Sequence, residues 1–167
     1  MFALVRTFTY AALFIGLVCI FGPSRLLSWS GIVQPVAITM QQVAGMVIGA
    51  TGAAVALWCW FTFALVGRGT PAPFDPPRRL VIQGPYRFVR NPMYIGADLV
   101  LAGMAIFFES LPVLVFTGLF ILTTHLFVVL YEESALRRTF GEEYEVYCSR
   151  VRRWCPSAST AHDSNAT

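Results

Sequence analysis

Long apolar stretches separated by short polar segments set the pattern of this 167-residue chain. A bilayer core about 30 Å thick needs about 20 helical residues to cross it. Three of the stretches meet that length, and a shorter one that contains Asp98 follows the second. Only Glu109 and Ser110 separate the last two, which indicates a tight helical hairpin. We predict an all-α, polytopic membrane protein with four transmembrane helices, at about residues 8–27, 42–66, 92–108 and 111–130.

Two polar clusters interrupt the apolar pattern, and the predicted topology puts both at one membrane face. Gly84–Tyr94 lies between the second and third spans and contains arginines and tyrosines. Tyr131–Glu133 follows the fourth span. Cations, carboxylates and phenol hydroxyls at one face would let a charged cofactor meet a lipid-soluble substrate. The pattern favours an enzyme that works at the membrane surface.

Composition supports the membrane interpretation. Hydrophobic residues make up 56% of the chain, charged residues 13%, and the mean hydropathy is +0.64. Soluble domains have about 45–50% apolar and about 25% charged residues. We predict one membrane domain over residues 1–156 and a disordered polar tail over 157–167. Such a chain has no room for a separate soluble catalytic domain, so its chemistry must use helix ends and loops.

Arginine sets the orientation, because the chain contains no lysine. With the N-terminus in the cytoplasm, Arg25 alone of the 12 arginines falls outside. This arrangement obeys the positive-inside rule, and it predicts that both termini are cytoplasmic. The net charge of +3 then reflects topology and attraction to anionic lipids, and it gives no reason to predict nucleic-acid binding.

An amphipathic helix is predicted after the fourth span, over about residues 131–148, with a break at Gly141. Its apolar and aromatic face recurs at intervals of three and four, through Leu136, Phe140, Tyr144 and Tyr147. We expect this helix to lie along the cytoplasmic interface and to cover a cofactor pocket. The basic residues of Arg150–Arg153 and the following Trp154 are expected to contact lipid headgroups.

The cysteines predict no chemistry. Cys19 and Cys59 lie within spans, and Cys148 and Cys155 lie in a cytoplasmic segment that should stay reduced. No close cysteine pair or histidine cluster has metal-ligand spacing. We interpret all four as ordinary small residues and predict no metal.

Glycines of the second span indicate a close helix contact. Gly45 and Gly49 lie four residues apart on one face, where another helix can approach without intervening Cβ atoms. Packing within the four-helix unit is the simpler expectation, and dimerisation is the alternative. The oligomeric state stays open.

Two ionisable residues lie within the predicted spans. Asp98 is four residues past Tyr94 and shares its helical face, and His125 is seven residues before Glu132. Ionisable groups inside a membrane are functional candidates. Asp98 and His125 could pair across the hairpin, line a substrate cavity or accept a proton.

The polar clusters carry a family resemblance that covers about residues 70–156. It rests on Gly84–Tyr86, Arg90–Tyr94, Glu132–Glu133, Leu136, Phe140–Gly141, Tyr144, Tyr147 and Val151–Pro156. In this order and setting, these residues resemble the isoprenylcysteine carboxyl methyltransferase and phospholipid methyltransferase superfamily.

The resemblance implies an integral membrane methyltransferase that uses S-adenosylmethionine (SAM), bound in a pocket on the cytoplasmic side. One departure matters: the family's motif histidine is Asn91 here, and an amide cannot act as an acid or a base. The cofactor contacts that the resemblance implies fall on Leu80, Val81, Tyr86, Arg90, Asn91, Pro92, Tyr94, Glu132 and Glu133.

The residue types suit SAM chemically. Its carboxylate needs a cation or a helix N-terminus, and Arg90 at the head of the third span offers both. Glu132 or Glu133 can take the ammonium or the ribose hydroxyls. Methyl transfer from a sulfonium is an in-line displacement that mainly requires positioning, and positioning can supply about 7–11 kcal/mol.

The acceptor stays open between an isoprenylated cysteine, an aminophospholipid and a small hydrophobic metabolite, because the first two spans carry no recognisable motif. A carboxylate needs no base, so O-methylation would leave Asp98 and His125 without a catalytic task. An ammonium group must lose a proton before it attacks, so N-methylation would give either residue the role of a base.

Two alternatives are kept. A steroid-reductase-like membrane oxidoreductase would bind a reduced nicotinamide phosphate, whose phosphates need more clustered cations than Arg78, Arg79 and Arg87 offer. The paired glutamates would also repel those phosphates. A non-catalytic membrane scaffold would have no need for an intact constellation of Arg90 and Glu132.

Overall fold

The computed structural model describes most of the chain, over residues 15–31, 38–63, 65 and 80–156. The beginning of the first predicted span, most of the loop after the second span and the predicted tail lie outside the described residues.

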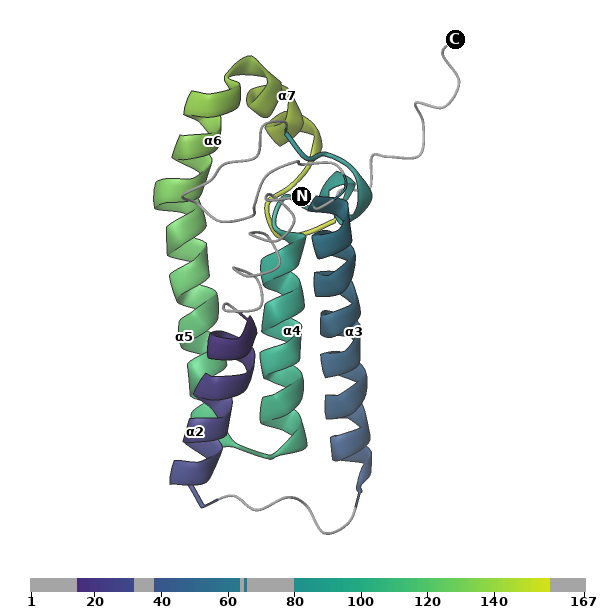
Figure 1. Ribbon diagram of the computed structural model, residues 1–167, viewed down its shortest axis with the longest axis vertical. Coiled ribbons are helices and arrows are strands. Elements are labelled where there is room, and N and C mark those ends of the chain that lie inside the picture. The colour runs from purple at the N-terminus through teal and green to yellow at the C-terminus, as the bar shows by residue number, and fades with distance from the viewer. Residues whose placement is uncertain (1–14, 32–37, 64, 66–79, 157–167) are drawn as a thin grey trace.

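Long helices standing side by side form the body of the molecule (Figure 1). They are α3 (Met40–Thr62), α4 (Pro92–Phe107) and α5 (Leu111–Phe127). The π-helical turn η1 (Ile15–Phe21) leads into α2 (Gly22–Trp29), which lies beside the half of the bundle that is remote from α7 (Figure 1). The all-α prediction is confirmed, since the described residues contain helices and a single isolated β-bridge.

Two helical runs are long and apolar enough to cross a membrane. They are Met40–Thr62, of 23 residues, and Leu111–Phe140, of 30 residues. The intervening α4 is apolar but shorter. Its bounds, Pro92–Phe107, confirm the helix that was predicted over 92–108. The membrane prediction is thus supported for two helices, and a four-span topology remains a proposal.

The closest helix contact joins α3 to α4 through a glycine interface made by Gly45, Gly52, Gly96 and Gly103. A Cβ atom on Gly45 would lie 2.7 Å from the carbonyl oxygen of Gly103. One on Gly52 would lie 2.5 Å from the carbonyl oxygen of Gly96. Because backbone faces backbone at both places, only glycine fits. The prediction that the glycines of the second span pack inside the bundle is confirmed.

Local signals begin and end α4. Pro92 occupies its first turn, where the missing N–H is harmless. After Phe107 the chain reverses within three residues, and Glu109 takes a φ of 49°. The Ser110 hydroxyl then caps α5 by accepting from the backbone N–H of Val113. The predicted hairpin is confirmed.

The fourth span extends beyond its predicted end. From α5 the helix continues through the π-turn η4 (Val128–Glu132) into α6 (Glu133–Phe140) without a break. The helix predicted over 131–148 therefore begins as a continuation of the fourth predicted span, and its place at a membrane interface stays a prediction. The turn comes at Gly141, whose φ of 51° ends α6, and α7 (Glu142–Arg150) follows. The predicted break at Gly141 is confirmed.

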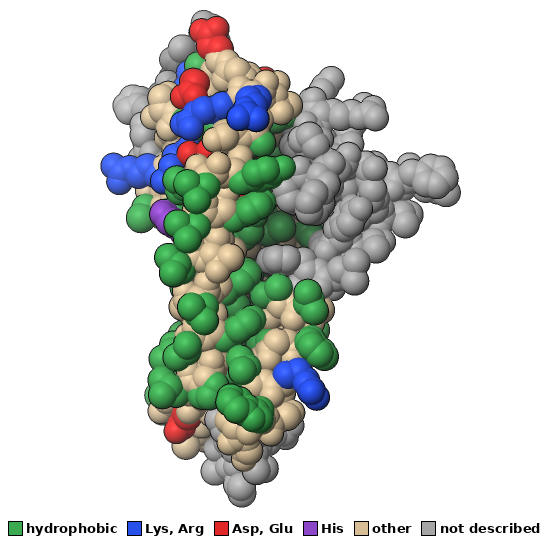
Figure 2. Space-filling view, turned by 90° about the vertical axis from the view of Figure 1, so that its left-hand side faces the viewer, with side chains coloured by type: hydrophobic (Ala, Val, Ile, Leu, Met, Phe, Trp, Pro, Cys, Tyr) green, Lys and Arg blue, Asp and Glu red, His purple; other side chains and the backbone are tan. Residues whose placement is uncertain are grey.

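Charged side chains gather at one end of the molecule. Figure 2 shows hydrophobic side chains along the helices and most of the visible arginines around α6 and α7. Among the described residues, Arg25 belongs to α2, which lies beside the other half of the bundle. The polar end of the bundle is therefore the end where α4 begins and α6 projects.

Candidate functional site

Residues 151–156, here called the C-terminal strap, return from α7 to the start of α4. Val89 and Arg152 form a parallel β-bridge. The backbone N–H of Arg90 donates to the carbonyl oxygen of Arg152 (3.0 Å). The side-chain amide of Asn91 donates to the carbonyl oxygen of Arg153 (3.3 Å). The strap thus fixes the segment that carries Arg90 and Asn91.

Glu133 lies at the centre of an arginine cluster. Arg153 donates to both of its oxygens, from Nε to Oε1 at 2.6 Å and from Nη2 to Oε2 at 2.9 Å. Arg90 Nη1 donates to Oε1 at 3.2 Å, and the Glu133 side chain is only 4% exposed. A bidentate guanidinium–carboxylate pair is among the strongest hydrogen-bonded pairs in proteins. The hydrogen bonds that Arg153 donates to Glu133 raise the pKa of the Arg153 guanidinium.

Glu132 has different surroundings from its neighbour. Tyr94 Oη donates to Glu132 Oε2 at 3.1 Å, which connects the first turn of α4 to the end of η4. Glu132 forms no ion pair within the described part of the chain. The two predicted glutamates therefore have different partners. Glu133 pairs with arginines, and Glu132 accepts a hydrogen bond from the Tyr94 hydroxyl.

Arg90 lies beside Glu133 at the head of α4. Besides Glu133, its Nη1 donates to Cys148 Sγ at 2.8 Å. Its Nε is buried and has no hydrogen-bond partner among the described residues. A buried donor without a partner costs free energy, which a bound acceptor would recover. Cation and helix N-terminus together make this corner suitable for an anion.

The other predicted cofactor residues lie in two apolar clusters around this corner. Val81 and Tyr86 are buried against Cys59 and Phe63 of the α3 end. Leu80 packs against the tyrosines and Val151 of the second cluster. Pro92 is buried at the first position of α4.

One hydrogen bond joins the two apolar clusters. The hydroxyl of Tyr147, in α7, donates to the carbonyl oxygen of Tyr86 at 2.6 Å. Burial raises the pKa of both phenols above the usual range, so they stay neutral donors. The helix α7 is thereby fixed against the segment η3 (Gly84–Arg87) that precedes α4.

Asp98 and His125, the predicted catalytic residues, do not pair. The indole N–H of Trp154 donates to His125 Nδ1 at 3.1 Å. Because the indole is only a donor, the neutral imidazole carries its proton on Nε2. Asp98 Oδ1 is buried without a hydrogen-bond partner in the described part of the chain. Of the alternatives predicted for these residues, pairing across the hairpin is not seen.

Sequence reasoning missed three residues of the polar end. Arg153 and Trp154 were expected to contact headgroups, yet both turn inward, toward Glu133 and His125. Cys148 was expected to be inert, and it contacts Arg90. The signal for Arg153 was its place in Val151–Pro156, a stretch that carries the family resemblance. Basic residues near membrane ends commonly anchor to lipid, which is why the sequence alone favours headgroup contact for Arg153.

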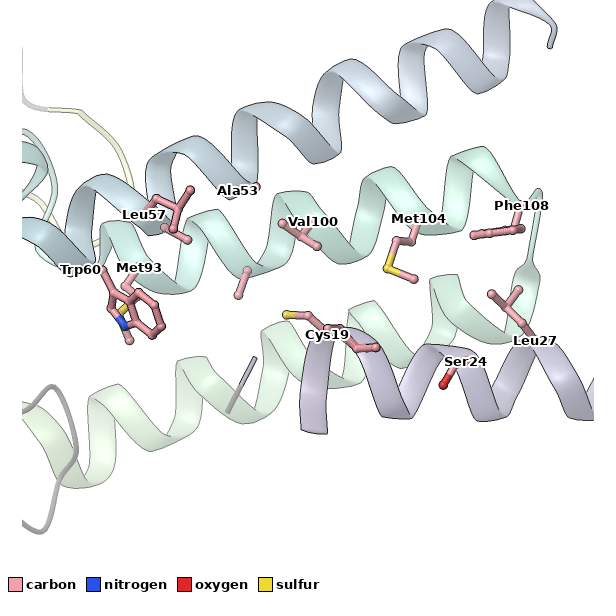
Figure 3. Close-up of a pocket in the computed structure, with 13 residues that line it drawn as sticks. Cys19, Ser24, Leu27, Ala53, Leu57, Trp60, Met93, Val100, Met104 and Phe108 are labelled. Atoms are coloured by element: carbon pink, nitrogen blue, oxygen red, sulfur yellow. The ribbon is translucent and has the colours of Figure 1, made fainter. Parts of the chain in front are cut away.

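A cavity of about 540 Å³ extends from this polar end along the bundle. On one side η1 and α2 contribute Cys19 and Leu27, and on the other α3 and α4 contribute Ala53, Met93 and Met104 (Figure 3). Met93 and Tyr94 both lie in the first turn of α4, so one end of the cavity is level with the candidate site along the bundle. Its volume lies in the range of small-molecule sites, about 300–1,000 Å³.

Comparison with known proteins gives one match. The phospholipid methyltransferase family model matches residues 40–143, more than half of the chain. The matched region includes Arg90, Tyr94 and both glutamates, and it confirms the resemblance noted in the sequence. No curated protein and no solved structure matches the chain.

Proposed function

Because this chain belongs to the phospholipid methyltransferase family, a group of membrane methyltransferases, we propose that it methylates a lipid-like or isoprenylated acceptor with SAM. The reaction takes place at the cytoplasmic face. In this proposal all four predicted helices span the membrane, both termini are cytoplasmic and α7 lies at the membrane surface. The gathering of described arginines around α6 and α7, with Arg25 toward the other end, supports this orientation.

One observation carries the proposal: where α4 begins, Arg90 pairs with Glu133, and Tyr94 bonds to the adjacent Glu132. The buried Nε of Arg90, which has no hydrogen-bond partner among the described residues, is available to the carboxylate of SAM. Glu132, bonded to the Tyr94 hydroxyl, retains acceptor capacity for the ammonium or the ribose hydroxyls. The donor and acceptor set therefore fits a zwitterionic nucleoside.

The remaining predicted cofactor residues have supporting tasks in this site. Leu80, Val81 and Tyr86 offer the apolar and aromatic surface that an adenosyl group requires, because they lie in the two clusters around the corner. Asn91 and Glu133 hold the C-terminal strap, and Pro92 begins α4.

SAM supplies a methyl group whose bond to sulfur breaks as the acceptor's lone pair forms the new bond. The protein's part is to hold both reactants in line, an effect that can supply about 7–11 kcal/mol. A covalent nucleophile is not required. The segment from Tyr86 to Tyr94, fixed by the strap and by Tyr147, gives the rigidity that such positioning needs.

An amine acceptor requires a base, and Asp98 is the stronger candidate. It lies one helical turn beyond Tyr94 on α4, and its Oδ1 has no partner within the described residues. His125 ranks second because its Nδ1 already accepts the Trp154 indole. A carboxylate acceptor would use neither residue, so N-methylation gives Asp98 a task that O-methylation does not.

Thermal unfolding of the detergent-purified protein tests the proposal. SAM and its demethylated product are each expected to raise the melting temperature, because a ligand that binds only the folded state stabilises it. A reduced nicotinamide phosphate should leave it unchanged. A shift with the nicotinamide and none with SAM would show a reductase instead, and no shift with any of the three would contradict the site.

Matched variants locate the binding. Arg90→Ala and Glu132→Ala should abolish the shift with SAM, and Arg138→Ala, an exposed cation on α6, should retain it. Retention of the shift in both site variants would place SAM elsewhere.

A further inference from the structure

None of the residues proposed to hold SAM lines the cavity beside the candidate site. We infer that this cavity binds the hydrocarbon chain of the methyl acceptor, with the chain along α4 and the reacting headgroup at Tyr94 and Glu132. This inference rests on the proposed function, and it adds where the apolar part of the acceptor lies.

The lining matches a hydrocarbon. Apart from Cys19, Ser24 and Trp60, it consists of alanine, leucine, isoleucine, valine, methionine and phenylalanine. The Ser24 hydroxyl donates to the carbonyl oxygen of Phe21 at 2.9 Å, so it is already satisfied. A ligand with polar groups along its length would lose hydration there and gain few hydrogen bonds.

Continuity with the candidate site fixes the direction of the chain. Met93 and Trp60 line one end of the cavity (Figure 3), and this end lies at the first turn of α4, the turn that also carries Tyr94. From Met93 the lining follows one face of α4 through Ala97, Val100 and Met104. At 1.5 Å per residue this face is about 17 Å long. An extended chain fits such a face, whereas a compact metabolite would fill only part of it.

Small side chains create the space. Ala53 faces the cavity from α3 in Figure 3, and a larger residue there would enter it. The adjacent Ala54 is equally exposed but does not line the cavity, because one residue rotates the helix face by about 100°. Ala53→Phe and Ala54→Phe are therefore a matched pair that adds the same side chain inside and outside the cavity.

Photolabelling of the full chain in phosphatidylcholine nanodiscs tests the inference. One probe is phosphatidylethanolamine with a diazirine in an acyl chain, and a second is an isoprenylated cysteine with a diazirine in its prenyl chain. Peptide mass spectrometry locates the adducts. Adducts of at least one probe are expected on Val100 and Met104. The yield of these adducts should fall about tenfold in Ala53→Phe, whereas Ala54→Phe should keep the yield of the unmodified protein.

The probe that labels the cavity shows whether the bound hydrocarbon is the acyl chain of a phospholipid or the prenyl chain of an isoprenylated cysteine. Adducts confined to outward-facing residues of α5, such as Leu119 and Leu122, would overturn the inference for both probes. So would equal labelling in the two phenylalanine variants.

A thermal shift with SAM on the same samples separates this result from the proposed function. Ala53→Phe should keep the shift, because Ala53 lines the cavity and none of the residues proposed to hold SAM does. Loss of labelling with a retained shift supports the inference, whereas a normal shift without cavity labelling overturns it alone. Absence of the shift in the unmodified protein would overturn the proposed function.

Discussion

The glycine interface of α3 and α4 and the arginine cluster around Glu133 hold helices together by opposite means. At Gly52 and Gly96 the contact consists of backbone against backbone, with no polar side chain involved. At Glu133 the elements meet through long charged side chains that pair with a buried carboxylate. Lipid tails are as apolar as leucine, so helices in a membrane gain little from hydrophobic burial and must fit closely. Near the membrane surface, water lowers the free-energy cost of placing charged side chains between helices. Ion pairs there can select one arrangement of the elements, because their hydrogen bonds are directional.

The largest effect is expected from breaking the glycine interface. A Cβ atom on Gly103 would lie 2.6 Å from both the carbonyl oxygen of Gly45 and the nitrogen of Gly49. Backbone atoms cannot move aside, so Gly103→Ala should cost about 4 kcal/mol of unfolding free energy, the range of severe core changes. Unfolding in mixed micelles by titration with sodium dodecyl sulfate measures it.

Gly118→Ala on α5 is the matched control. No atom lies within 4 Å of a Cβ there, so alanine should be neutral or stabilise the helix by up to about 1 kcal/mol. Equal destabilisation by the two alanines would mean that the close contact of α3 and α4 does not govern stability.

An intermediate effect is expected at the arginine cluster. Glu133→Gln leaves Arg153 and Arg90 without their carboxylate, and breaking a buried pair costs about 3–5 kcal/mol. Arg153→Ala should cost less, because Arg90 still pairs with Glu133 and the Arg153 side chain is 31% exposed. The double variant should cost less than the sum of the single ones.

The same titration measures these variants, with Arg152→Ala as the control. Arg152 is the exposed neighbour of Arg153, and its loss should change stability by no more than about 0.5 kcal/mol. Strict additivity of Glu133→Gln and Arg153→Ala would show that the bidentate pair contributes nothing.

The smallest effect is expected from the exposed pair at the outer end of α6. Arg137 Nε lies 2.7 Å from Glu145 Oε1, with the side chains 47% and 56% exposed. Solvent and salt screen such pairs, so Glu145→Gln should leave the melting temperature unchanged at physiological salt. A melting scan at low and high salt checks this. If Glu145→Gln lost as much stability as Glu133→Gln, the buried pair would not contribute more to stability than the exposed pair.

Features with local causes were predicted correctly from the sequence. Proline at the start of α4, two polar residues in the hairpin and glycine after Phe140 each act on the backbone of their own neighbourhood. The glycine pattern of the second span also indicated a close partner, although only the structure shows that Gly96 and Gly103 of α4 are opposite.

Features with distant causes were not predicted. Whether the helix bends after Leu130 depends on what its last turns pack against, and Leu136 and Phe140 pack against the tyrosines of α7. Arg153 lies 20 residues from its partner Glu133 along the chain, so no spacing rule connects them. Within the candidate site, sequence identified Arg90, Tyr94 and the glutamates, but the different surroundings of Glu132 and Glu133 emerge only from the fold.

The C-terminal strap also determines when the polar end can form during biosynthesis. Residues 151–156 leave the ribosome after every proposed span, and domains generally begin to fold in the order of their synthesis. Until then, Glu133 lacks the bidentate partner that neutralises it, and the segment before α4 lacks its β-bridge. In the proposed topology, the membrane helices can therefore be inserted and packed while the proposed cofactor site is still open. A nascent chain stalled before Val151 would be a membrane-inserted protein with an unfinished binding site.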